Sequence, residues 1–220
     1  MCGIALWLYQ GGTPTVNSTS TESPRIWGGT TLATRQKARR EKLLAVGLDL
    51  LGSPGSTLSV RAACRSAQLT ERYFYESFPD RDALVLAVYE ELAGEVRQAL
   101  EEAGAGTDDD SSEVARRSIE ALVTLMVDDR RKGRVLLVAP LTEAVLAEPS
   151  QALLPALGEL IRAKLPRSTP ADQRTLISVG LLGSLTALFY AYLEGEMQVS
   201  REALVTHCVA VLNHAGHLAG

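Results

Sequence analysis

Polar and aromatic side chains with the spacing of a DNA-reading element lie between residues 59 and 78. Ser59 precedes a short segment with an apolar face, residues 67–69 form a tight connection, and Thr70 precedes a second short segment. Because serine and threonine are favoured helix N-caps, the pattern predicts two short helices joined by a tight turn. Such a helix-turn-helix places its second helix across the first, where it can enter the major groove of DNA.

The second of these helices is predicted to present polar and aromatic groups outward. Residues 70–73 are expected to face away from the module, whereas Phe74 and Phe78 are expected to face its core. Free backbone N–H groups and the helix dipole meet at Thr70, which suits a phosphate group. An arginine at position 72 could also read guanine through its two acceptors. These features indicate recognition of double-stranded DNA.

The elements that must position these groups are all helical. From Thr34 onward, apolar residues recur at helical spacing, with glycine, proline and serine at the breaks, and no segment predicts a convincing strand. Pro140 is expected to kink or break the sixth helix. The pattern predicts an all-α protein of about nine helices, near residues 34–51, 59–66, 70–78, 80–102, 112–129, 131–147, 151–164, 172–194 and 201–217.

Charge divides the chain into a basic module and an acidic body. The net charge is -4, but residues 35–82 hold nine basic and six acidic side chains, whereas residues 83–220 hold 12 and 19. A basic module on an acidic body indicates that one end meets a polyanion. We expect a DNA-binding domain at 35–82, a ligand-binding and dimerisation domain at 83–220, and a disordered leader rich in Gly, Thr, Ser and Pro at 1–34.

The same residues carry a resemblance to a known family. The helix-turn-helix and its flanks read LLAVGLDLL at 43–51, LSVRAAC at 58–64 and LTERYFYESFPDRDAL at 69–84. The pair Tyr75 and Phe78, just before a capped helix, is the most diagnostic part. Here the sequence resembles the TetR family of bacterial transcription regulators, and the nine-helix layout extends the resemblance over residues 35–220. It implies a homodimeric regulator, commonly a repressor, that binds a pseudo-palindromic operator and is released by a small-molecule effector.

The resemblance also implies roles for individual residues. Thr70 and Tyr75 would contact phosphates, and Arg72 and Tyr73 would face bases. Arg81 would reach a phosphate from the start of the fourth helix.

Two further residues belong to the predicted DNA interface. Ser59 caps the first helix of the motif, and Arg39 lies in a basic run, 35–42, that could be an arm in the minor groove or a solvated helix face. The family pattern is broken at Gly47, where alanine is favoured, and at Arg72, where a small residue is frequent.

A stripe of small residues on a long apolar helix predicts the dimer interface. Its members recur at helical spacing and are Gly180, Gly183, Ser184, Ala187 and Ala191. Small side chains let another helix approach closely, so a four-helix bundle between two copies is expected. Packing against a neighbouring helix of the same chain is the alternative.

An apolar pocket is expected among the helices of the acidic body. Its predicted lining residues, each of which could instead be plain core, are Met126, Leu137, Leu141, Phe189 and Tyr190. Since no buried charge cluster stands out, a hydrophobic or amphipathic effector is favoured over an anionic one.

The sequence does not favour enzymes, metal sites or membrane spans. Three cysteines without a close pair exclude a disulfide framework and a Cys-x-x-Cys site. His207, His214 and His217 on the last helix lack a convergent partner, so neither a metal nor a cofactor is expected. Apolar runs fall short of the roughly 18 residues of a membrane span, and no signal peptide is evident. We expect a cytoplasmic protein that is not an enzyme.

The opening residues Met1-Cys2-Gly3-Ile4 carry an alternative. They resemble the start of class II glutamine amidotransferases, in which Cys2 would become an N-terminal nucleophile with the terminal amine as its base. That amidohydrolase would need a two-sheet α/β sandwich over about the whole chain. The absence of predicted strands argues against it.

Overall fold

The computed structural model describes residues 31–105, 111–166 and 168–218. Over these ranges the chain contains no strand and forms nine α-helices: α1 Leu32–Gly52, α2 Val60–Ala67, α3 Glu71–Tyr75, α4 Arg81–Ala103, α5 Ser111–Val123, α6 Arg130–Leu137, α7 Ala147–Lys164, α8 Ala171–Glu194 and α9 Arg201–Leu218. The all-α prediction is confirmed. The described residues offer no strands for an amidotransferase sandwich, and Cys2 itself lies outside them.

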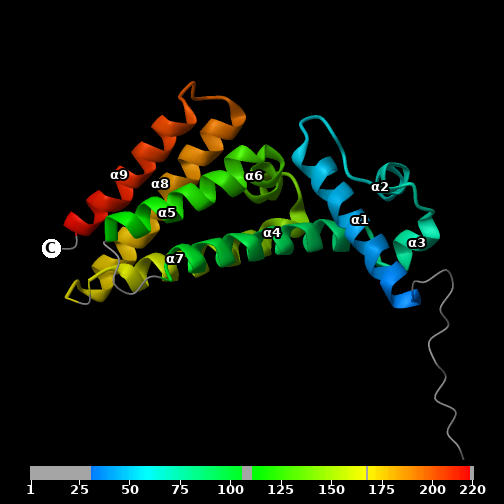
Figure 1. The fold of residues 1–220 in the computed structure, drawn as a ribbon, viewed down its shortest axis with the longest axis horizontal. Helices are drawn as coiled ribbons and strands as arrows, with labels where there is room; N and C mark the ends of the chain where they lie inside the picture. The colour runs from blue at the N-terminus through cyan, green and yellow to red at the C-terminus, as the bar shows by residue number, and fades with distance from the viewer. Residues whose placement is uncertain (1–30, 106–110, 167, 219–220) are drawn as a thin grey trace, which may run out of the picture.

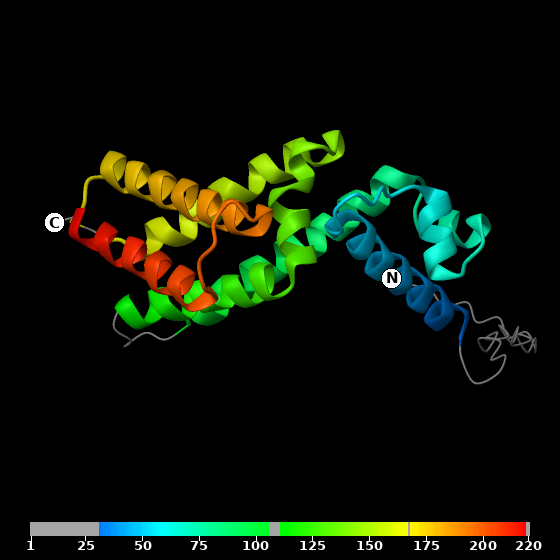
Figure 2. The same ribbon diagram turned by 90° about the horizontal axis from the view of Figure 1, so that it is seen from above.

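The helices form two lobes joined by one long helix. Figure 1 shows α1, α2 and α3 together at one end and α5, α7, α8 and α9 at the other, with α4 running between them. The view from above gives the same division (Figure 2). One cluster of buried apolar side chains continues from the small lobe along α4 into the large one. The continuous core means that the position of α4 affects both lobes.

The caps predicted from the sequence set the starts of the early helices. Ser59 accepts a hydrogen bond from the backbone N–H of Ala62, and Asp80 accepts one from Ala83 at 2.8 Å. Thr31 caps α1 in the same way, so residues 32–34 of the predicted leader are helical instead. A side-chain oxygen at the N-cap satisfies a backbone donor that has no partner within the helix.

The small lobe is a three-helix module built on aromatic residues. Phe74 is fully buried, Phe78 is 2% exposed, and their ring centroids are 6.0 Å apart. The α2–α3 turn is made by Gln68, whose φ of 52° and ψ of 43° lie in the left-handed region. Its backbone N–H donates to the carbonyl of Arg65, which closes the end of α2. This turn sets the crossing of the two short helices.

The long helix predicted at 131–147 is three elements instead of one. After α6 the chain makes two 3-10 turns, η2 at Ala139–Leu141 and η3 at Ala144–Leu146. Pro140 lacks a backbone N–H and cannot continue the α-helical ladder, which accounts for the break. The predicted helix at 112–129 likewise ends early, because α5 passes into a π-helical turn, η1, at Thr124–Asp128.

Helix α8 is apolar on more of its surface than the core covers. By length and composition it could cross a membrane, with a mean hydropathy of 1.8 in its most apolar 18 residues, and only 33% of that window is buried. The expectation that no apolar segment is long enough to span a membrane is therefore wrong by this measure. Phe189 and Leu193 on its inner face are buried, while Leu176 is 74% and Val179 is 65% exposed.

Candidate nucleic-acid interface and effector cavity

Helix α3 presents the predicted base-reading side chains to solvent. The Arg72 side chain is 85% exposed, Tyr73 is 38% exposed and Tyr75 is 55% exposed. Thr70 is the N-cap residue, but its hydroxyl makes no capping hydrogen bond. These four residues lie on the outer surface of the module, where the sequence predicts them.

A carboxylate at the end of α3 holds two arginines. Glu76 accepts from Arg72 Nε and from Arg39 Nη2, each at 3.2 Å. The guanidinium of Arg39 also lies 4.4 Å from the centroid of the Tyr73 ring, within cation–π range. With its side chain only 17% exposed, Arg39 braces α3 from α1 and is not placed as a free arm.

A second arginine of α1 makes a similar contact that the sequence did not reveal. The Arg40 guanidinium lies 4.3 Å from the Phe78 ring centroid and donates to the backbone carbonyl of Ser77 at 3.0 Å. Arg40 is exposed, and the basic run gave no signal that its guanidinium would lie over an aromatic ring of the module. Together Arg39 and Arg40 hold α3 and the residues that follow it against the first helix.

Arg81, predicted to contact a phosphate, is engaged by groups of the chain itself. Its guanidinium donates to the backbone carbonyl of Leu58, to Asp82 and, at 2.6 Å, to both carboxylate oxygens of Glu143. The hydrogen bond with Glu143 is the main reason why the pKa of Arg81 is raised. Because Glu143 lies between η2 and η3, this contact joins the small lobe to the body.

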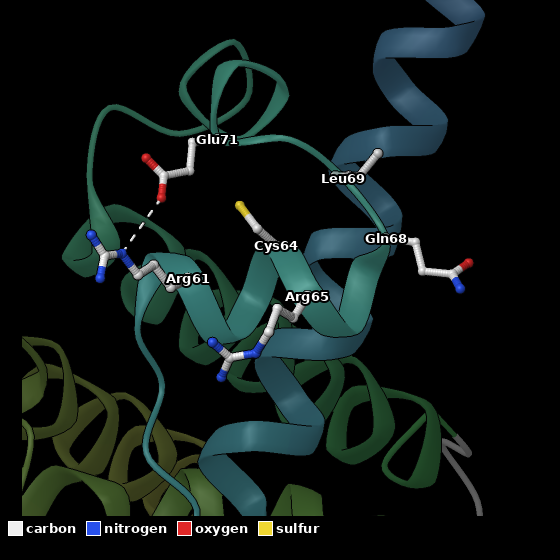
Figure 3. A pocket seen from close by; sticks show the side chains of 6 residues that line it. All are labelled: Arg61, Cys64, Arg65, Gln68, Leu69 and Glu71. Carbon is white, nitrogen blue, oxygen red and sulfur yellow. Dashed lines mark ion pairs between the residues drawn. The ribbon is translucent and has the colours of Figure 1, made fainter.

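A shallow hollow of about 410 Å³ lies between α2 and the start of α3. Figure 3 shows the Cys64 side chain pointing into it, with Arg61 and Glu71 forming an ion pair of 3.8 Å at one edge. Burial, and next the negative charge of Glu71, raise the pKa of the Cys64 thiol. The thiol is therefore held protonated and is a poor nucleophile at neutral pH.

The body contains a much larger cavity of about 1090 Å³. Four of the predicted residues, Met126, Leu137, Leu141 and Phe189, line it, and Leu141 is 69% exposed. Tyr190 is not among its lining residues, because successive residues of a helix point about 100° apart and Phe189 already faces inward. Leucines from α5, α7 and α8 that the sequence did not single out complete the wall: Leu122, Leu153, Leu157, Leu181 and Leu185.

The stripe of small residues on α8 lies at the surface. Gly180, Gly183 and Ala187 are exposed, and Ser184 and Ala191 are half-buried. A Cβ atom added at either glycine would meet no other atom within 4 Å. The exposed Leu176 and Val179 extend the same face by one turn, and because they are large they do not belong to the small-residue pattern.

Comparison with known proteins identifies the architecture. No protein-family model matches the sequence, and no curated protein matches it. Solved structures do match: a TetR-like transcriptional regulator from Rhodococcus sp. RHA1 superposes with a TM-score of 0.63 and 20% identity over 83% of this chain and 96% of that one. The chain has the TetR fold.

Two further solved structures share this fold. A TetR family transcription regulator from Marinobacter aquaeolei VT8 matches with a TM-score of 0.56 and 18% identity, covering 85% of this chain and 98% of that one. The multidrug binding protein EbrR, complexed with imidazole, matches with a TM-score of 0.60 and 16% identity, covering 80% and 94%. The resemblance found in the sequence is thus confirmed at the level of the fold.

Proposed function

We propose that this protein is a transcription regulator, acting as a repressor, that binds a pseudo-palindromic DNA operator as a homodimer and is released by a small-molecule effector. The observation that carries the proposal is the exposed face of α3, with Arg72, Tyr73 and Tyr75 outward and Arg39 bracing it from behind. An anchored helix with exposed polar and aromatic groups suits the major groove, because a groove-reading side chain must keep its position on binding. The cytoplasm is the proposed location.

Contacts to DNA divide into base reading and phosphate binding. Arg72 and Tyr73 would face base edges, and Thr70 and Tyr75 would reach phosphates on either side. Arg72 can exchange its ion pair with Glu76 for a guanine, since the Arg72 side chain is 85% exposed and a pair of this kind is weak. The exposed Arg61 and Arg65 of α2 supply further positive charge nearby.

The dimer would form through α8, with α9 completing a four-helix bundle with the partner. The exposed apolar stripe of α8 is the support for this, because large apolar patches on a water-exposed surface usually mark an interface. Glycines at positions 180 and 183 allow the closest approach of a symmetry-related helix. Two copies would set two α3 helices roughly 34 Å apart, one turn of DNA.

The effector would act on the spacing of the two small lobes. The segment from α6 to η3 touches the cavity through Leu137 and Leu141 and holds the small lobe through Arg131 and Glu143. A ligand that moves this segment or α4 would shift the population towards a spacing that no longer fits the operator. EbrR, which shares the fold, is a multidrug binding protein, and this supports a small-molecule ligand.

The test is a footprint of full-length protein on DNA from upstream of its own gene, followed by selection from genomic DNA. Protection of a pseudo-palindrome whose affinity falls steeply with salt is expected. Arg72→Ala should weaken binding by about 1–3 kcal/mol and relax specificity at one base pair. Arg116→Ala, an exposed arginine on α5, is the matched control and should change little. No protected site in either experiment would refute the proposal.

The dimer has a separate test. Gly180→Arg should leave the chain folded, because the position is exposed and an added Cβ meets nothing within 4 Å, but it should give monomers in sedimentation and lose operator affinity. Gly158→Arg on α7, where a Cβ also meets nothing within 4 Å, is the control and should remain dimeric. Dimers of the Gly180 variant would exclude this face.

A further inference from the structure

A largely buried tyrosine lies on the wall of the cavity, and its hydroxyl has no partner among the described residues. Tyr89, on α4, is 2% exposed and lines the cavity. Within the described part of the chain no group forms a hydrogen bond with its hydroxyl. Burial raises the pKa of this phenol to about 12, so it stays neutral and can both donate and accept. The Tyr89 oxygen is not sealed off completely, so a molecule in the cavity can reach it and supply the hydrogen bond.

The wall of the cavity carries almost no charge. Among the described residues that line it there is no lysine, arginine or histidine, and the one carboxylate, Glu101, is exposed. The remaining polar groups are a few hydroxyls and amides, and one of the amides, Asn213, already donates to Ser112. An anion placed here would lose its hydration and gain no opposite charge, which is costly.

Size and lining together define the occupant. A volume of about 1090 Å³ is at the upper end for drug-sized ligands, and the wall is built mainly from leucines. Resting on the proposed function, we propose that the effector is a neutral molecule with a long apolar body and a hydroxyl or carbonyl oxygen that hydrogen-bonds to Tyr89. Alcohols, ketones and esters belong to this class, and free carboxylic acids at neutral pH do not.

The position of Tyr89 gives the contact a regulatory consequence. The flanking residues Val85 and Val88 belong to the core that continues into the small lobe. A ligand oxygen at Tyr89 therefore acts directly on the helix that joins the two lobes. An apolar ligand without such an oxygen would fill the cavity with less effect on α4.

The experiment uses full-length protein and three probes of equal chain length: 1-decanol, decanoate and decylammonium. Calorimetry should show decanol binding at least tenfold more tightly than either ion. Tyr89→Phe should weaken decanol binding roughly fivefold, the value of one hydrogen bond, and leave the thermal midpoint of the free protein unchanged. Tyr190→Phe removes the same oxygen outside the cavity lining and should bind decanol like the wild type.

The outcomes separate this inference from the proposed function. Decanoate or decylammonium binding as tightly as decanol, unchanged decanol affinity in Tyr89→Phe, or no decanol binding would each overturn the effector class. Operator protection decides the regulator independently. A protein that protects DNA but ignores decanol refutes only the effector chemistry, whereas one that binds decanol through Tyr89 but protects no DNA refutes the regulator alone.

Discussion

The ion pair between Arg81 and Glu143 should couple the small lobe to the body by a measurable free energy. Arg81 begins α4, Glu143 lies 62 residues later between η2 and η3, and Arg81 Nη2 is 2.6 Å from both carboxylate oxygens. The two side chains are 30% and 19% exposed. Such a partly buried, charge-assisted contact is stronger than a surface pair but remains within reach of solvent.

The magnitude follows from two opposing terms. Two unit charges about 4 Å apart attract by about 4 kcal/mol at the dielectric of a protein surface. Partial desolvation of both groups offsets more than half of this. We expect a coupling free energy of about 1.5 kcal/mol between Arg81 and Glu143. An exposed pair on a helix is expected to contribute only about 0.4 kcal/mol.

A double-mutant cycle in urea unfolding measures this coupling. The variants are Arg81→Met and Glu143→Gln; both remove the charge, Gln keeps the size of Glu, and Met keeps the unbranched aliphatic stem of Arg. The control cycle uses Arg116→Met and Glu120→Gln, whose side chains are 55% and 45% exposed. A coupling free energy for Arg81 and Glu143 no larger than that of the control pair would refute the reasoning, because non-interacting sites give additive effects.

Three further predictions concern stability. Gly133→Ala should lower the free energy of unfolding by about 3 kcal/mol, because the added Cβ would lie 2.1 Å from the carbonyl oxygen of Met126. Gly158→Ala, where the Cβ meets nothing within 4 Å, should raise the free energy of unfolding by about 0.5 kcal/mol. Equal urea midpoints for the two variants would contradict this. Gln68→Gly should stabilise by about 1 kcal/mol by relieving a left-handed backbone, and a loss of stability would count against that strain. Burial raises the pKa of Cys208 from 9.0 to about 11, so the folded state keeps this proton to higher pH than the unfolded state does. The free energy of unfolding should therefore fall by roughly 3 kcal/mol as the pH rises from 9 to above 11. Cys208→Ala should remove that part of the pH dependence, and an unchanged slope would argue against it.

Local signals in the sequence were sufficient for the all-helical fold, for most of the helices and for the helix-turn-helix. Ser59 and Asp80 act as caps where expected, and Phe74 and Phe78 are buried where the spacing predicts. These features depend on residues three or four apart, so the sequence contains both partners. The structure also explains Gly47, which departs from the family pattern: a larger residue would not fit, because a Cβ there would lie 2.8 Å from the Val88 side chain on α4.

Contacts between distant residues could not be predicted in this way. Arg39 and Arg81 are basic residues beside a DNA-reading motif, and both were expected at DNA. Their carboxylate partners, Glu76 and Glu143, lie 37 and 62 residues away, and nothing local indicates which arginine turns inward. Tyr89 was not considered for the cavity because a buried tyrosine in an apolar helix has the pattern of plain core.

Two glycines show how closely α6 is held between the lobes. A Cβ at Gly52, the last residue of α1, would lie 2.6 Å from the Cα of Arg131, and one at Gly133 would lie 2.7 Å from Leu193 at the end of α8. A helical glycine costs about 1 kcal/mol relative to alanine, so these positions give up helix propensity for close approach. Helices packed this closely move together when one of them is displaced, because the contact between them cannot be compressed gradually. A movement of α6 caused by a ligand against Leu137 would therefore reach the end of α1 with no side chain between the backbones to absorb it.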